Sequence, residues 1–229
     1  MTSTPLTTAT FCLLVGVVAL CVLGALRKAG WTWGALAALV LLYLLAPALL
    51  ALSGRLDGYT PMPAPGLLLL LGLTLLTVGT TLSGPGRRTA AAVPGATLVL
   101  FQAFRLVVEG LLHRLYKEGA VPVQMTYLGR NWDILSGVSG LLLGLWLLRG
   151  RPAPRWLLLS WNVLGLGLLT NIVVIAVLST PVPFRHFLEG PPNLLPSTFP
   201  FIWLPSFLVQ VALASHLLIF QQLRRETAG

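Results

Sequence analysis

The sequence contains several uninterrupted apolar runs, each about as long as a membrane is thick. The first three read ATFCLLVGVVALCVLGAL at residues 9–26, WGALAALVLLYLLAPALLALS at residues 33–53 and GLLLLLGLTLLTVGTTLS at residues 66–83. A helix needs roughly 20 apolar residues to cross a hydrocarbon core of about 30 Å, whereas the strands of a membrane barrel are shorter and alternate in polarity. The runs therefore predict an all-α transmembrane bundle.

The composition argues against a soluble domain. Of the 229 residues, 56% are hydrophobic and 9% are charged, and the mean hydropathy is +0.86. Soluble domains usually contain about 25% charged residues. We therefore expect residues 1–229 to form a single integral membrane domain whose main partner is the lipid bilayer.

Seven spans are expected in this polytopic bundle. They cover approximately residues 9–26, 31–53, 65–83, 94–117, 132–148, 155–179 and 198–222. The first has no basic segment before it and is followed by Arg27 and Lys28, so we expect a retained helix rather than a cleaved signal peptide. Most connections are short, but residues 118–131 and 180–197 are long enough to cover one mouth of the bundle.

Basic residues alternate from loop to loop and predict the orientation. The formal net charge is +9, but no basic patch is present, so no nucleic-acid partner is expected. One set of alternate loops, with the C-terminal segment, holds nine basic residues: Arg27, Lys28, Arg87, Arg88, Arg149, Arg151, Arg155, Arg224 and Arg225. The other side holds five basic and four acidic residues: Arg55, Arg114, Lys117, Arg130, Arg185, Asp57, Glu118, Asp133 and Glu189. Basic loops stay in the cytoplasm, which places the N-terminus outside and the C-terminus inside a cytoplasmic (inner) membrane.

The fourth predicted span carries a row of polar side chains. At about 100° per residue, one face of the helix holds Gln102, Arg105, Glu109, His113 and Tyr116. A charge at mid-membrane costs at least about 2.5–3.5 kcal/mol, so this face should avoid lipid. Arg105 and Glu109 are four residues apart and are expected to form an ion pair, with His113 one turn further outward.

Polar residues of later spans are expected to meet this row. They are Ser136 in the fifth span, Asn171 in the sixth, and Ser206 and Gln210 in the seventh. The outer mouth is expected to gather Lys117, Glu118, Arg130, Asn131 and Asp133. We predict a polar pocket between the fourth to seventh spans that opens to the outside, with the first three spans as a scaffold.

The predicted function is binding or transport of a small solute in this pocket. The candidate binding residues are Gln102, Arg105, Glu109, His113, Asp133, Asn171 and Gln210. Ionisable residues inside a membrane usually serve function, and Arg105 would anchor a charge. Proton exchange between Glu109 and His113 is chemically allowed, although the neighbouring arginine favours an ionised glutamate.

Two other functional classes stay open. A membrane enzyme could use Glu109 and His113 for acid–base or metal-assisted work on a lipid-like substrate, because the i, i+4 spacing suits two ligands on one helix. The chain has no HExxH, CxxC or GxSxG motif, so we assign no catalytic residue, metal or cofactor and do not favour an enzyme. A structural or assembly subunit could use the row as a clamp or as a contact for a partner helix.

The remaining polar residues and the two cysteines are interpreted as structural. Asn131 is expected to cap the fifth helix, with Asp133 in its first turn. His216 is expected near the cytoplasmic end of the seventh span and is left out of the site. Cys12 and Cys21 are about 13 Å apart along one helix, which is too far for a disulfide between them.

Overall fold

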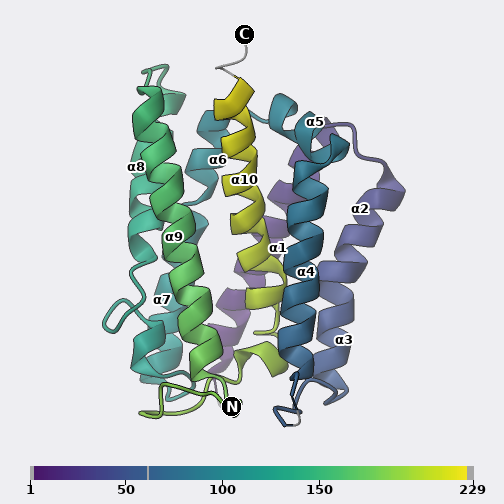
Figure 1. Cartoon of the computed structure of the whole chain (residues 1–229), viewed down its shortest axis with the longest axis vertical. Coiled ribbons are helices and arrows are strands. Elements are labelled where there is room, and N and C mark those ends of the chain that lie inside the picture. Colours follow the sequence, from purple (N-terminus) through teal and green to yellow (C-terminus); the bar gives the residue numbers. More distant parts are fainter. Residues whose placement is uncertain (1–2, 61, 226–229) are drawn as a thin grey trace.

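The computed structural model describes residues 3–60 and 62–225, and it is all-α over these residues. The α-helices are α1 Pro5–Lys28, α2 Trp33–Val40, α3 Ala46–Leu52, α4 Pro65–Leu82, α5 Gly84–Ala92, α6 Gly95–Phe101, α7 Phe104–Lys117, α8 Ile134–Leu148, α9 Arg155–Ser179 and α10 Val209–Arg225. Short π-helices lie at Leu41–Leu45 (η1) and Leu204–Leu208 (η4), and 3-10 helices at Val123–Met125 (η2) and Leu195–Ser197 (η3). The long helices run side by side, with the start of α1 at one end of the bundle and the end of α10 at the other (Figure 1).

Helical stretches long and apolar enough to cross a membrane number six among the described residues. They are Pro5–Lys28, Trp33–Leu52, Pro65–Leu82, Gly95–Lys117, Arg155–Ser179 and Leu204–Arg225. Leu13, Leu142 and Leu164 point away from the interior and are more than 60% exposed. A surface this rich in exposed leucine suits lipid rather than water. The prediction of an all-α, multi-span membrane protein is confirmed.

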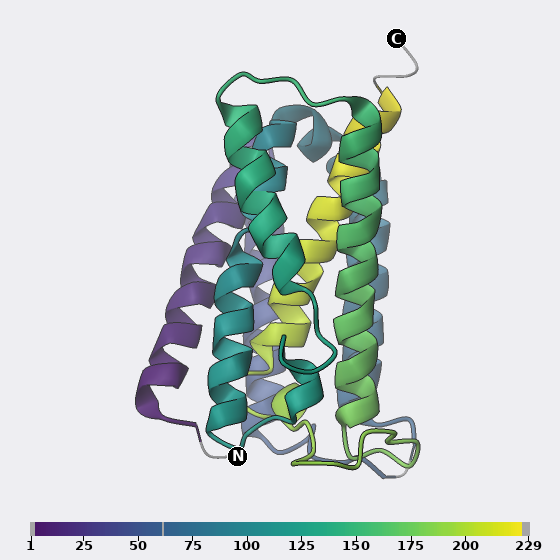
Figure 2. The same cartoon turned by 90° about the vertical axis from the view of Figure 1, so that its left-hand side faces the viewer.

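The predicted fifth span, residues 132–148, forms a shorter helix. α8 has 15 residues, about 22 Å at 1.5 Å per residue, which is less than a core of about 30 Å. The preceding chain, residues 118–133, turns at one end of the bundle and rises to its middle, where α8 begins (Figure 2). Non-helical backbone is tolerated here because protein covers it: Val121, Met125 and Asn131 are at most 1% exposed.

The fourth span is interrupted at mid-length, between α6 and α7. The N–H groups of Gln102 and Arg105 donate to carbonyls three residues earlier, those of Val99 and Gln102, instead of four. This 3-10 type of turn is tighter than the α-helix on either side. The two halves have different neighbours, because α6 packs chiefly on α8, whereas α7 contacts both α1 and α8.

Glycines on α8 permit its close approach to α6 and to the start of α7. A Cβ on Gly144 would lie 2.5 Å from the Cα of Leu100, and a Cβ on Gly137 would lie 2.8 Å from the backbone nitrogen of Leu106. Small residues bring helix backbones together in membranes. This contact sets the position of α8 and therefore of Asp133, which directly precedes it.

The two π-helical segments lie against each other. Pro47 has no N–H to donate to the carbonyl of Tyr43, one turn earlier in η1. The hydroxyl of Ser206 in η4 donates to this carbonyl at 3.1 Å, and the indole of Trp203 donates to the carbonyl of Leu44 at 2.9 Å. A distant segment thus satisfies backbone groups that the interrupted helix leaves available.

The basic segments gather at one end of the bundle. The end of α1, helix α5, the α8–α9 connection and the end of α10 lie at the same end in both views (Figures 1 and 2). Helix α5 occupies a stretch predicted only as a connection, and it carries Arg87 and Arg88. The opposite end holds the long connections at residues 118–133 and 180–197.

Candidate functional site

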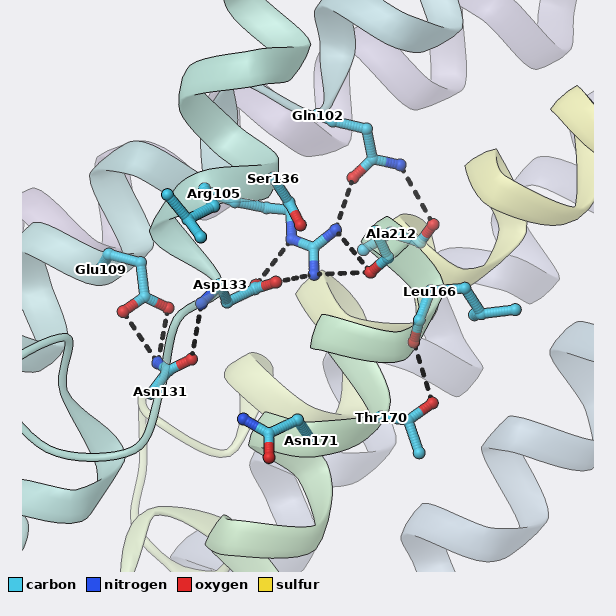
Figure 3. A network of polar contacts seen from close by, with 12 residues as sticks. Gln102, Arg105, Glu109, Asn131, Asp133, Ser136, Leu166, Thr170, Asn171 and Ala212 are labelled. Atoms are coloured by element: carbon cyan, nitrogen blue, oxygen red, sulfur yellow. Dashed lines mark hydrogen bonds and ion pairs between the residues drawn. The ribbon is translucent and has the colours of Figure 1, made fainter. Parts of the chain in front are cut away.

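Arg105 and Asp133 form a buried ion pair inside the bundle (Figure 3). Nε of Arg105 lies 2.7 Å from Oδ2 of Asp133, and Nη2 contacts the other carboxylate oxygen. The two residues are 2% and 4% exposed. Two parallel contacts of this kind are the strongest geometry for an arginine and a carboxylate.

Two predictions about these charges are wrong. No ion pair joins Arg105 to Glu109 among the described residues, and Asp133 does not lie at the outer mouth. The reason is the short α8, which begins inside the bundle and so delivers Asp133 directly to Arg105.

The remaining donors of Arg105 also have partners. Nη1 lies 3.0 Å from Nε2 of His216 and 3.4 Å from Oε1 of Gln102. Both Nη atoms approach the carbonyl of Gly165, at 3.4 and 3.5 Å. The Gln102 amide donates in turn to the carbonyl of Ala212 at 3.2 Å. Arg105 thus joins α7 to Asp133, directly before α8, and to residues of α9 and α10.

His216 takes part in this network as a neutral ring. An arginine can only donate, so Nε2 of His216 accepts from Arg105 and Nδ1 carries the proton. Nδ1 lies 2.8 Å from Oδ1 of Asn162, whose amide donates to the His216 carbonyl at 3.0 Å. Gly165 leaves room for the ring, because a Cβ there would lie 2.6 Å from its Cε1.

His216 and Asn162 belong to the site but are not among the predicted binding residues. The expectation that His216 lies apart from it is wrong, because His216 is fully buried and contacts Arg105. The position of each residue along its span could have indicated this. Asn162 is seven residues from the start of α9, and His216 is nine residues from the end of α10. These distances, about 10 and 13 Å from the same end of the bundle, place the two side chains at similar levels.

Glu109 is 1% exposed and has a different kind of partner. Nδ2 of Asn131 donates to both carboxylate oxygens, at 2.7 and 2.8 Å, and lies 3.0 Å from the carbonyl of Met125. Oδ1 of Asn131 accepts from the N–H of Asp133 at 3.1 Å. Asn131 therefore links the two acidic residues instead of capping α8 as predicted, and the residue directly before that helix is Asp133.

The charges of this cluster do not balance when all three groups are ionised. The single positive charge of Arg105 is matched by Asp133. Within the described chain, no basic side chain forms a hydrogen bond or an ion pair with Glu109. Glu109 is thus a buried carboxyl with an amide partner and no cation of its own.

A narrow cavity of about 80 Å³ lies between α4, α7, α9 and the η4–α10 helix. Arg105, Glu109 and Asp133 border it, and most other residues that line it are apolar. Along α9 the lining runs from Leu169 to Thr180, about 16 Å. The cavity is therefore elongated and extends from the charged cluster towards the end of the bundle where α9 finishes. Helix α4, from the predicted scaffold, supplies one of its walls.

Four predicted binding residues do not border this cavity. Gln102, the first of them, instead belongs to the Arg105 network described above. His113 is half-buried and stacks on Tyr127 with ring centroids 4.8 Å apart, and its Nδ1 has no hydrogen-bond partner in the described part of the chain. Asn171 is exposed on α9 and donates to the carbonyl of Arg130 at 2.9 Å. Gln210 is buried and borders a second, larger cavity.

The structure does not assemble the metal-binding set considered from the sequence. Over the described residues, no group of three or more His, Cys, Asp or Glu side chains is placed to hold a metal ion. Glu109 bonds to Asn131, whereas His113 stacks on Tyr127. The two candidate ligands on α7 therefore serve separate contacts.

The apolar helices and the enclosed ion pair together define a multi-span helical membrane protein with charged residues in its interior. Residues 62–224 match the model of a family described as "Domain of unknown function (DUF8737)", and the chain belongs to this family. The match extends from just before α4 almost to the end of α10, so it includes every residue of the Arg105 network. No curated protein and no solved structure matches the chain.

Proposed function

We propose that the protein crosses a cytoplasmic membrane seven times, with its N-terminus outside, and that it binds a small solute for transport. The fifth crossing would combine α8 with the buried segment at residues 118–133. Support for the orientation comes from the nine basic residues, which belong to segments at one end of the bundle. The narrow cavity would then open towards the outside.

The observation that carries this proposal is the unmatched carboxyl of Glu109 on the wall of the cavity. Burying an ionised carboxylate without a cation is costly in protein and in membrane. A proton or a positively charged solute would remove that cost. Glu109 is therefore the group at which a solute and a proton would compete.

The cavity suits a small cation with a short apolar body. Its walls are mostly apolar, and Asp133 matches the charge of Arg105. The described residues that line the cavity therefore offer no unpaired positive charge to an anion. A protonated Glu109 would release its proton when the ammonium group of the solute takes its place. Movement of the solute would in this way be linked to movement of a proton in the opposite direction.

The test uses purified protein in detergent and a series of primary ammonium ions from methylammonium to butylammonium. A solute that binds only the folded state raises the unfolding temperature with concentration. We expect such a rise for at least one member of the series and no rise for Glu109→Gln. Carboxylates of the same chain lengths should produce no shift in either protein.

A matched variant separates binding from folding. His113→Gln changes a residue on the same helix that does not border the cavity, so it should keep the ammonium response. Two results would rule out Glu109 as the solute site. One is a wild-type unfolding temperature that no ammonium ion of the series changes, and the other is an equal rise in wild type and in Glu109→Gln. Uptake of the responding ion into liposomes, driven by a pH gradient, then tests transport.

A second role, structural, is supported by the completeness of the Arg105 network. Every nitrogen of the guanidinium has a partner, from Asp133 directly before α8, from α9 or from α10. Buried polar contacts specify helix packing even where each contributes little energy. In our proposal Arg105 holds the helices in register, and Glu109 meets the solute.

A further inference from the structure

The larger cavity is an open apolar groove of about 950 Å³, bordered by α1, the α2–η1 helix, α6 and α10. Its volume lies at the upper end of the range for pockets that hold a whole ligand, about 300–1,000 Å³. Along α1 the lining runs from Leu14 to Lys28, about 21 Å. This length exceeds half the thickness of a hydrocarbon core of about 30 Å, which is the depth of one lipid leaflet.

One end of the groove is polar. Lys28, Trp31 and Thr89 border it there. Nε1 of Trp31 donates to Oγ1 of Thr89 at 3.0 Å, which joins the α1–α2 connection to α5. Tryptophan is enriched where the membrane meets water, so this end lies at the level of lipid head groups.

Lys28 borders this end of the groove, and three arginines are next to its lining residues in the chain. Lys28 and Arg88 have no hydrogen-bond or ion-pair partner among the described residues, and Arg27 and Arg87 are close along the chain. The acidic residues that the structure describes lie elsewhere, in the interior or in segments at the opposite end: Asp57, Glu109, Glu118, Asp133 and Glu189. The groove thus joins an apolar part of leaflet depth to a cationic rim, formed by Lys28 and the neighbouring arginines, that has no acidic partner among the described residues.

We propose that this groove holds one anionic phospholipid of the leaflet on the basic side. The phosphate would lie at Lys28, and an acyl chain would follow α1 towards Leu14. Basic pockets between transmembrane helices recognise anionic head groups in this way. A zwitterionic lipid with the same acyl chains would fill the groove equally well, but its head group would be attracted less strongly by the basic residues of the rim. This site is separate from Glu109 and does not depend on the solute proposal.

The experiment measures lipid binding to the full chain in detergent by native mass spectrometry. Phosphatidylglycerol and phosphatidylcholine with identical acyl chains are titrated, and sn-glycerol 3-phosphate serves as the free head group. We expect phosphatidylglycerol to bind more tightly than phosphatidylcholine and glycerol phosphate not to bind. Lys28→Gln should weaken phosphatidylglycerol binding about fivefold, the loss expected for one basic residue near an anionic lipid.

Two glycines on α1 give a matched pair of steric variants. Gly24 borders the groove and Gly16 does not, and a Cβ on either meets nothing within 4 Å. Gly24→Phe should therefore abolish phosphatidylglycerol binding, and Gly16→Phe should leave it unchanged. Arg149→Gln, at the same end but outside the groove, is the control for charge.

Three outcomes would overturn the proposal. Equal affinity for the two phospholipids would show that the basic residues of the rim do not select an anionic head group. Binding of free glycerol phosphate as tight as that of the phospholipid would make the site a phosphate site without a lipid chain. Unchanged binding in a folded Gly24→Phe protein would place the lipid elsewhere; if that variant does not fold, unchanged binding in Lys28→Gln decides against the site.

Discussion

Arg105 illustrates how one residue can carry a charge in the interior of a membrane bundle. A guanidinium offers donors in a fixed planar fork, and here they meet Asp133, His216, Gln102 and the Gly165 carbonyl. Formation of such a pair gives little net stability, because both charges lose their hydration. Removal of one partner is far more costly, since the other charge stays buried alone.

The residue-level prediction is a severe loss of stability in Asp133→Asn. The variant leaves the Arg105 charge buried without a counter-ion, which costs about 3–5 kcal/mol. The measurement is the free energy of unfolding in detergent. Asp57→Asn makes the same change at an exposed position and should cost less than about 0.5 kcal/mol. Similar losses in the two variants would contradict the importance of the ion pair.

At the level of elements, the position of α8 decides where the site forms. Its glycines fit against α6, and its first turn is placed at mid-bundle, so the non-helical chain before it must also be buried. A full-length helix in this place would carry Asp133 away to the end of the bundle. The short helix is thus the reason that Asp133 reaches Arg105.

At the level of elements, we predict that Gly144→Ala destabilises the contact between α8 and α6. The new Cβ would lie 2.5 Å from the Cα of Leu100, and backbone cannot move aside as a flexible side chain can. Overpacking of this kind typically costs about 1–3 kcal/mol. Gly167→Ala on α9, where a Cβ meets nothing within 4 Å, should be neutral or slightly stabilising. Thermal unfolding of both variants checks this order, and an unchanged Gly144→Ala protein would contradict the close contact.

At the level of the whole molecule, Glu118, at the end of α7, holds the start of α1 against the rest of the bundle. Its carboxylate accepts from the N–H and hydroxyl of Thr4 at 3.1 and 2.8 Å, from the Thr7 hydroxyl at 2.6 Å and from Arg114 at 3.4 Å. Burial by itself would raise the pKa of Glu118, but these hydrogen bonds outweigh it and lower the pKa. The folded state therefore favours the ionised form.

This attachment predicts a pH dependence. A carboxyl whose pKa is lowered by folding adds stability above the ordinary glutamate pKa of about 4.3, and this stability is lost as the pH falls through the lower, folded value. Glu118→Gln should remove this contribution, about 1 kcal/mol at neutral pH, and flatten the acid limb of the unfolding curve. Glu189→Gln, in the long connection before α10, is the control. An acid limb of unchanged slope in Glu118→Gln would contradict the attachment.

Helix identity and membrane environment could be predicted from the sequence, because both follow from the length and polarity of local runs. The interior position of Arg105 and Glu109 also follows from the cost of exposing charge to lipid. Their partners could not be predicted in this way. Asp133 reaches Arg105 only because α8 is short, and His216 does so through packing between residues 111 positions apart. Such contacts depend on tertiary geometry that periodicity does not contain.

The wide spacing of the partners of Arg105 has a consequence for biosynthesis. Asp133 follows it by 28 residues and His216 by 111, and translation proceeds from the N-terminus. The nascent fourth span therefore enters the membrane before its counter-ion has left the ribosome. The earlier helices must keep the Arg105 charge away from lipid until Asp133 and α8 have been inserted. His216 follows only with the last helix, α10. A ribosome stalled before α10 should accordingly leave a chain that is inserted in the membrane but lacks the contact between Arg105 and His216.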